Sequence, residues 1–556
     1  MSRIRSSDRR QRSHASPGEQ RPRLLDSVTL LEPRSGATAW IVALDDVPVA
    51  RVAPGAVDVL RLLDGQRTLP EVRRIVGAGA EELGELVAHL SASGLLAEAP
   101  RRRPRAVTVI PPLTVQFATT RLTPLLTAIS DRVRPAFDRR ALRRTVLVAL
   151  VVLLIAGAAA AVAQLPVLAA VAGAPLSLGS LAAVAIALVL ATGIHELAHG
   201  LVLHLAGGTA RRTGLMVFYL TPAFFVDVTD GWRLPRRRHR LAVALAGPAV
   251  HAAAASVAVL LGLASGPGPT REAASAFALA AAGITALNLL PFVRFDGYYA
   301  LVAATDTPHL RERAREALDA LVTGTSGDRR PWILLLGLGS LIAPTVLVLL
   351  AAGRIAHWSS SAGVVGAVLM SGLAVLLAVV VARACVRWVR RPGRRGRRVA
   401  LLVVVLGAAL AASLVVPVSR TVTVGYVSDE RGAWLVASEA DALDALLTGD
   451  PVALETQGVL LHQHVGAGSV GAPLSTGPTT APLECFAPVR VAGEPVSVAS
   501  RPLLLDAGEK APRAGAAVVE VGDDRPALTA AVEHLLGLVD AVAGPHHSVH
   551  DHSDQR

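Results

Sequence analysis

Seven long apolar stretches restrict the possible folds of this chain more than any other feature of its sequence. Each is close to the roughly twenty residues that a helix needs to cross a bilayer. They cover residues 145–163, 178–206, 241–264, 273–293, 331–352, 362–382 and 400–417. The 556 residues are 52% hydrophobic and only 18% charged. The pattern predicts a polytopic α-helical membrane protein with about seven spans.

Positive charge lies beside these stretches and accounts for most of the formal net charge of +12. Arginine-rich loops occur at 207–240, 294–330 and 383–398. They alternate with loops that hold two arginines between them, at 164–177, 265–272 and 353–361. The positive-inside rule explains this alternation without a nucleic-acid partner. It predicts a multi-pass protein of the cell membrane with a cytoplasmic N-terminus and an extracytoplasmic C-terminus.

The second apolar stretch contains the sequence HELAH, which supplies His195, Glu196 and His199. A spacing of four residues places both imidazoles on one face of a helix, as two nitrogen ligands of a tetrahedral zinc ion require. Glu196 lies on a neighbouring face, where it can polarise a metal-bound water as a general base. Ionisable groups inside a membrane helix are costly, which favours a functional role.

A third zinc ligand is expected from the end of the fourth apolar stretch, which reads NLLPFVRFDGYYAL. Pro291 would break the helix. Asp296 would then lie at the same depth as His199, since both are near the cytoplasmic ends of their spans. We therefore predict one Zn²⁺ per chain, held by His195, His199 and Asp296. His204 is about 140° around the helix from His199 and is expected at the membrane interface instead.

Residues 214–228 are apolar but are divided by Pro222, so neither half can span a bilayer as a helix. We predict a hairpin or re-entrant element beside the metal. Its free strand edge could pair with an extended substrate, although a lid without a substrate role fits equally well. Asp227 and Asp230 at its exit are polar or gating candidates, and we do not expect them to be ligands.

Soluble segments flank the predicted membrane core. Residues 22–100 read as two strands and three short helices, which suggests a winged-helix-like domain. A structural cap and a nucleic-acid-binding winged helix are the alternatives. Residues 307–322 are predicted to form an amphipathic surface helix.

The two cysteines form no CxxC pair, which argues against a thiolate zinc site. The remaining predicted parts are a disordered segment 1–21, a basic linker 101–144, the transmembrane core 145–417 with the metal site, a small extracytoplasmic α+β domain 418–540 and a His-rich tail 541–556.

The paired motifs resemble those of the site-2 protease class of intramembrane zinc metalloproteases, over residues 178–301. Within that class, FYLTPAFFVDVTDGWR and FDGYYAL are similar to the peptide zinc metalloproteases of ribosomal peptide maturation systems, including the daptide type. The N-terminal domain resembles the PqqD-like domains that bind leader peptides. The resemblance implies His195, His199 and Asp296 as ligands, Glu196 as base, and Asn288 and Pro291 in a substrate-side loop. The class often has an asparagine where this chain has His251.

These features leave three functional hypotheses. In the first, a zinc endopeptidase removes the leader from a peptide precursor captured by the N-terminal domain. In the second, the enzyme cleaves a membrane-bound regulator within the bilayer. In the third, the chain is a metal-stabilised exporter or scaffold without proteolytic activity. The expected partners are a peptide or membrane-protein substrate and the lipid bilayer.

Overall fold

The computed structural model describes residues 21–529 apart from short gaps, of which 32–39 and 98–106 are the longest. Residues 1–20 of the predicted disordered segment and the whole His-rich tail lie outside the described residues. Two compact units are present. The first comprises residues 1–143, 193–247 and 299–307, and the second comprises 144–192, 248–298 and 308–556.

Six helices in the described part of the chain are long and apolar enough to cross a membrane, which confirms a polytopic helical protein. They are α5 (Arg140–Ala163), α7 (Leu178–Leu205), α8 (Arg237–Ala264), α12 (Pro331–Ser360), α13 (Gly363–Val389) and α14 (Arg395–Val415). The expected span at 273–293 forms α9 (Pro269–Asn288) but is not among the six. Arg271 and Glu272 in its first turn lower its mean hydropathy.

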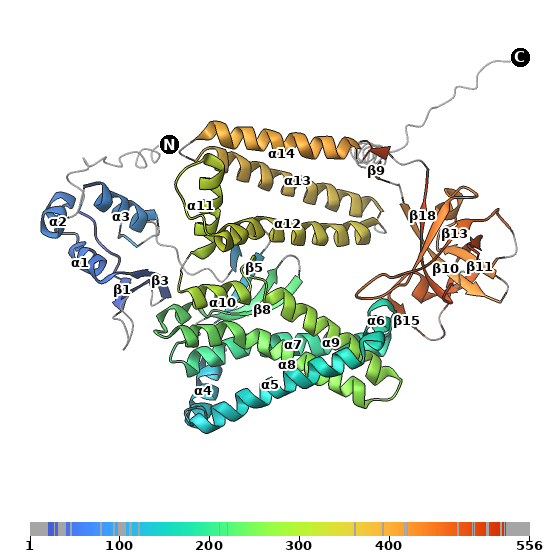
Figure 1. Cartoon of the computed structure of the whole chain (residues 1–556), viewed down its shortest axis with the longest axis horizontal. Coiled ribbons are helices and arrows are strands. Elements are labelled where there is room, and N and C mark those ends of the chain that lie inside the picture. The colour runs from blue at the N-terminus through green and yellow to red at the C-terminus, as the bar shows by residue number, and fades with distance from the viewer. Residues whose placement is uncertain are drawn as a thin grey trace, which may run out of the picture. The chain divides into compact units, whose positions relative to one another are not determined.

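The first unit begins with a small antiparallel sheet that carries three helices (Figure 1). Its strands are β1 (Val28–Leu31), β2 (Trp40–Leu44) and β3 (Val47–Val52), followed by α1 (Pro54–Leu62), α2 (Leu69–Val76) and α3 (Ala80–Ala92). Val42, Leu60 and Val72 are almost fully buried in its core. The sequence predicted two of the strands. It missed β3, which contains Pro48, because proline weakens a strand pattern.

A second sheet of the first unit joins distant segments in the order β4-β5-β7-β8. The strands are β4 (Val107–Ile110), β5 (Thr114–Thr119), β7 (Thr213–Phe218) and β8 (Thr221–Val226), and α4 (Thr123–Phe137) follows β5. The segment 101–144, predicted as a basic linker, thus contains β4, β5 and α4. The predicted hairpin is present as β7 and β8, which pair antiparallel.

The helices of the second unit include three that are too short or too polar to count as spans. These are α6 (Leu165–Gly173), α9, and α11 (Leu310–Thr323), where an amphipathic helix was predicted. Asp319 of α11 accepts hydrogen bonds from the Arg398 guanidinium at 2.9 and 2.6 Å and from the Trp388 indole at 2.9 Å. The carboxylate thereby connects α11 to α13 and α14.

Helix α10 (Asp296–Thr305) has its first residues in the second unit and the rest in the first, and α7 and α8 are likewise divided between the two units.

The C-terminal part is a closed barrel with the strand order β10-β11-β17-β13-β12-β18 (Figure 1). These strands are β10 (Thr421–Asp429), β11 (Gly432–Ala437), β12 (Pro451–Glu455), β13 (His464–Val470), β17 (Ala499–Leu505) and β18 (Ala514–Glu520). Tyr426, Leu435 and Leu454 fill its interior and are fully buried. The sequence indicated strands here but not their closure, which depends on pairing between distant segments.

Short elements complete the structure. Three two-stranded pairs join β14 (Thr480–Pro482) with β16 (Pro495–Ser497), β15 (Val489–Arg490) with β6 (Leu176–Ser177), and β19 (Arg525–Pro526) with β9 (Pro417–Val418). The remaining helices are one-turn α15 (Asp441–Asp444) and the 3₁₀ helices η1 (Thr229–Arg233) and η2 (Leu483–Cys485).

The burial of Cys485 makes its thiol unreactive. Its side chain is 1% exposed, its Sγ donates to the Tyr426 carbonyl at 3.3 Å, and burial raises its pKa to about 12. At pH 8 only about one thiol in ten thousand would be ionised. In a Cys385→Ser variant we expect no alkylation of the native protein by iodoacetamide at pH 8, and complete alkylation after denaturation, both read by intact mass.

The Cys485→Ser variant is the matched control, because it leaves the partly exposed Cys385 as the single thiol. Alkylation of native Cys485 at the rate of a free thiol would contradict the buried position.

Candidate metal centre

His195 and His199 lie one turn apart on α7 and are almost fully buried, at 4% and 5% exposed. Their Nε2 atoms are 3.2 Å apart, and the rings are nearly perpendicular at 79°. Two nitrogens bound to one tetrahedral zinc at the usual bond length of about 2.0–2.1 Å would be separated by about 3.3 Å. The observed separation therefore fits two ligands of a single ion.

The hydrogen bond made by Nδ1 of His199 decides which of its ring nitrogens carries the proton. Nδ1 is 2.6 Å from the backbone carbonyl of Val243 on α8. A carbonyl oxygen can only accept, so Nδ1 carries the proton and Nε2 presents its lone pair. Metal-binding histidines characteristically make this outer hydrogen bond, which fixes the ring and strengthens its donor nitrogen.

The absence of a side chain at Gly247 leaves space next to the Nε2 atoms of His195 and His199. A Cβ atom at this position of α8 would lie 2.3 Å from Nε2 of His199 and 2.4 Å from Nε2 of His195. Only a residue without a side chain is compatible with these positions. Val243 and Gly247 are one helical turn apart, so a single face of α8 both orients His199 and leaves room beside the imidazoles.

Asp296 completes a group of three candidate ligands. One ligand atom from each of His195, His199 and Asp296 lies within 4.8 Å of the others. Asp296 is the first residue of α10. Two imidazole nitrogens and one carboxylate oxygen form a donor set typical of catalytic zinc, so the residues present fit that ion.

The turn that precedes Asp296 is tight. Helix α9 ends at Asn288, and the chain turns through Pro291 before α10 begins. A Cβ atom on Gly297 would lie 2.2 Å from the Leu289 carbonyl oxygen, so the turn folds closely against the start of α10. Asn288 and Pro291 are partly exposed and do not belong to the ligand group. Their substrate-side role remains a prediction.

Glu196 connects the histidines to the edge strand of the sheet. Its Oε1 is 3.8 Å from Nε2 of His195, and its Oε2 accepts a hydrogen bond from the Val226 N–H at 2.9 Å. Val226 is the last residue of β8. The carboxylate is thus held between the candidate ligands and the end of a strand, with its side chain 19% exposed.

The other polar residues considered from sequence have structural contacts. Asp227 accepts from the Thr229 N–H at 3.0 Å, and Asp230 accepts from the Thr209 N–H at 2.8 Å. His204 is 4% exposed and its Nε2 accepts from the Ala210 N–H at 3.0 Å. His204, which the sequence predicts at the membrane interface, is covered by the chain that follows α7. His251 is buried within α8.

No protein-family model, curated protein or solved structure matches the chain. Its function must therefore be inferred from the geometry of the site.

Three contributors to the site were not identified from the sequence. The carbonyl of Val243 and the N–H of Val226 act through the backbone, which side-chain patterns do not reveal. The need for a glycine at position 247 becomes clear only when the neighbouring histidines are placed.

Replacing Gly247 with alanine should remove the metal. The added Cβ would lie less than 2.5 Å from both Nε2 atoms and would displace the imidazoles. Alanine favours a helix more than glycine does, so α8 itself should still form. We expect bound zinc, measured by elemental analysis of the purified protein, to fall from about one ion per chain to near zero.

Gly262→Ala is the matched control on the same helix, because its Cβ would make an ordinary 3.4 Å contact with Ser275. Equal zinc content in the two variants would contradict the assignment of the metal centre.

Proposed function

We propose that this protein is a zinc-dependent endopeptidase that cleaves peptide bonds within the membrane. The observation that carries the proposal is the position of Glu196 on α7, one residue from a candidate ligand and hydrogen-bonded to the end of an edge strand. The donor set of His195, His199 and Asp296 supports zinc, and the apolar helices that carry the site support cleavage within the bilayer.

The ligands, Glu196 and the backbone partners would each have a separate role in hydrolysis. Zinc bound to the three ligands would act as a Lewis acid that acidifies water and polarises the scissile carbonyl. Glu196 would accept the proton of the attacking water and deliver it to the leaving amine. Its Oε2 is held by the Val226 N–H, and its Oε1 faces His195. The hydrogen bond to the Val243 carbonyl would keep the His199 ring oriented, with Nε2 toward the metal.

Strand β8 is the proposed substrate platform. It lies at the edge of its four-stranded sheet. A transmembrane substrate must unwind before cleavage, because helical hydrogen bonds occupy its carbonyls. Pairing with β8 would hold the unwound segment extended beside Glu196. Asn288 and Pro291, in the turn before Asp296, are proposed to contact the same segment.

The proposed substrate is the leader or another membrane-associated part of a peptide precursor, cleaved during modified ribosomal peptide biosynthesis. The N-terminal sheet and helices would act as a winged-helix-like, PqqD-like leader-binding domain facing the cytoplasm. The barrel would form an extracytoplasmic domain, in keeping with the arginine distribution. Cleavage of a membrane-bound regulator and a non-proteolytic exporter or scaffold are the alternative functions.

Loss of the carboxylate at position 196 should abolish cleavage without removing zinc. General acid–base groups contribute roughly 10²–10⁴-fold to rates, so we expect at least a hundredfold loss in the Glu196→Ala variant. New peptide N-termini in membranes of cells expressing the wild type or the variant would measure cleavage, and elemental analysis would measure zinc. Glu312→Ala removes an exposed carboxylate paired with Arg294 at 2.6 Å and is the matched control.

Identical N-termini in the wild type and the Glu196→Ala variant would rule out the mechanism. The inactive variant also distinguishes the alternatives, since it should retain uncleaved substrate during purification. A small peptide precursor supports the maturation role, and a single-pass regulator supports regulated proteolysis. Full biological function of the variant supports an exporter or scaffold.

A further inference from the structure

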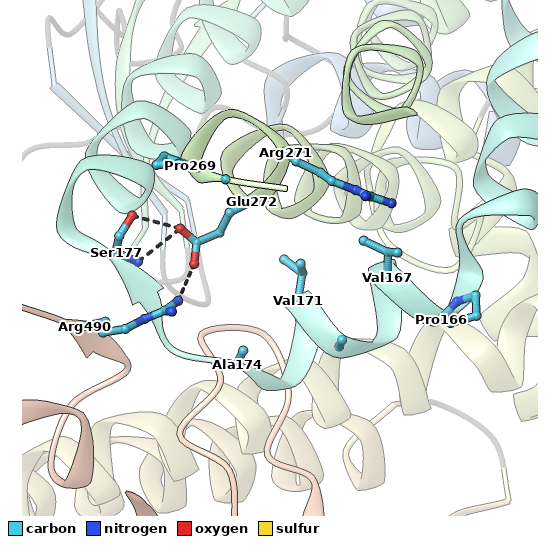
Figure 2. Close-up of a pocket in the computed structure, with 11 residues that line it drawn as sticks. Pro166, Val167, Val171, Ala174, Ser177, Pro269, Arg271, Glu272 and Arg490 are labelled. Atoms are coloured by element: carbon cyan, nitrogen blue, oxygen red, sulfur yellow. Dashed lines mark hydrogen bonds and ion pairs between the residues drawn. The ribbon is translucent and has the colours of Figure 1, made fainter. Parts of the chain in front are cut away.

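A cavity of about 880 Å³ lies between α6 and the start of α9 (Figure 2). One wall is apolar and is formed by Pro166, Val167, Ala170, Val171 and Ala174. The opposite side includes the first residues of α9. The volume is within the roughly 300–1,000 Å³ typical of small-molecule pockets. The cavity therefore has room for a ligand with a substantial apolar part.

The sequence position of α6 places the cavity at a membrane surface. Helix α6 connects α5, which ends at Ala163, with α7, which begins at Leu178, and both neighbours are candidate spans. A short connection between consecutive spans lies at the level of the lipid headgroups. The cavity is consequently exposed to a region rich in molecules with a charged head and an apolar tail.

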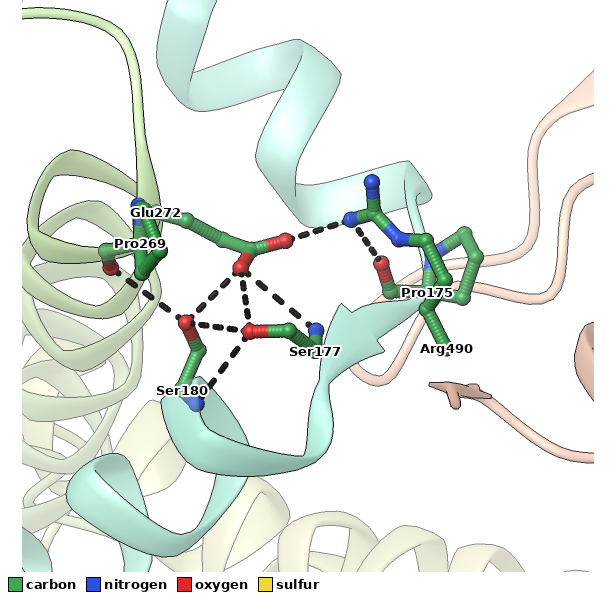
Figure 3. Close-up of polar contacts among 6 residues, drawn as sticks. All are labelled: Pro175, Ser177, Ser180, Pro269, Glu272 and Arg490. Carbon is green, nitrogen blue, oxygen red and sulfur yellow. Dashed lines mark hydrogen bonds and ion pairs between the residues drawn. The ribbon is translucent and has the colours of Figure 1, made fainter. Parts of the chain in front are cut away.

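A polar cluster at one end of the cavity balances its own charge (Figure 3). Glu272 forms an ion pair with Arg490 at 2.6 Å. The other carboxylate oxygen of Glu272 accepts hydrogen bonds from the hydroxyls of Ser177 at 2.8 Å and Ser180 at 2.7 Å. Neither Glu272 nor Arg490 needs an external counter-ion.

Arg271 is the uncompensated charge of the cavity. It lines the cavity beside Val167 (Figure 2). Its Nε is buried and has no hydrogen-bond partner, and no carboxylate among the described residues pairs with its guanidinium. A buried donor without an acceptor is costly. Guanidinium groups bind phosphate oxygens particularly well, because their donors match the spacing of two acceptors.

We propose that this cavity binds an anionic phospholipid, with its phosphate on Arg271 and an acyl chain along the apolar wall of α6. The inference is independent of the metal centre and of the proposed peptidase activity. Because Arg490 of β15 also lines the cavity and β15 pairs with β6, the bound lipid would contact both the membrane helices and the C-terminal part of the chain.

Native mass spectrometry of the full-length protein tests this site, with equimolar phosphatidylglycerol and phosphatidylcholine as probes. We expect one phosphatidylglycerol per chain, bound about tenfold more tightly than phosphatidylcholine. Arg271→Gln should remove this preference. Ala170→Trp, which fills the cavity without changing its charge, should weaken binding of both lipids, and Val167→Trp provides a second cavity-filling variant. Arg329→Gln removes an exposed arginine elsewhere and should bind lipid as the wild type does.

Equal binding of the two lipids by the wild type would overturn the proposal, as would an unchanged preference in Arg271→Gln. Inorganic phosphate provides the other arm of the test. Displacement of phosphatidylglycerol by equimolar inorganic phosphate would show that the site takes the anion alone, and unchanged lipid binding in both tryptophan variants would show the same. Failure of these experiments would leave the zinc content and the Glu196 phenotype unaffected.

Discussion

The placement of two buried histidines and one mostly buried glutamate in an apolar helix is the constraint on which the surrounding structure depends. Each imidazole or carboxylate on α7 would cost several kcal/mol if it lost water without gaining a partner. The Val243 carbonyl meets this requirement for His199, and the Val226 N–H meets it for Glu196. Both partners are backbone atoms, which rigid helices and strands position more exactly than flexible side chains do.

The same constraint explains why α8 and the β-hairpin pack against α7. Helix α8 supplies a hydrogen-bond acceptor and, one turn later, an empty position at Gly247. Strand β8 supplies a donor at its last residue. One side of α7 is therefore fixed by a helix and another by a strand, and neither can shift without exposing a buried polar group. Such preorganisation is what a catalytic centre requires.

The sequence predicts the elements of this protein better than their pairing. Membrane helices follow from runs of apolar residues, and the ligand group follows from HELAH and from a proline that ends a helix before Asp296. The pairing of β5 with β7 and the closed barrel did not follow, because each depends on a partner far away in the chain. The contact of His204 did not follow because its partner is a backbone N–H, which side-chain patterns do not reveal. Of the seven predicted spans, α9 is the one that is not apolar enough to count among the six candidates in the described residues, since it carries Arg271 and Glu272 in its first turn.

The pairing of β5 with β7 has a consequence for how the protein is made. Thr119 and Thr213, at matching ends of the two strands, are 94 residues apart, and α5, α6 and α7 lie between them. During synthesis β5 emerges long before β7, so its edge stays open while the intervening helices insert. The complete sheet, whose strand β8 contacts Glu196, can form only after α7 has been synthesised. Assembly order alone would thus leave the carboxylate of a nascent chain without its Val226 contact until translation has passed that helix.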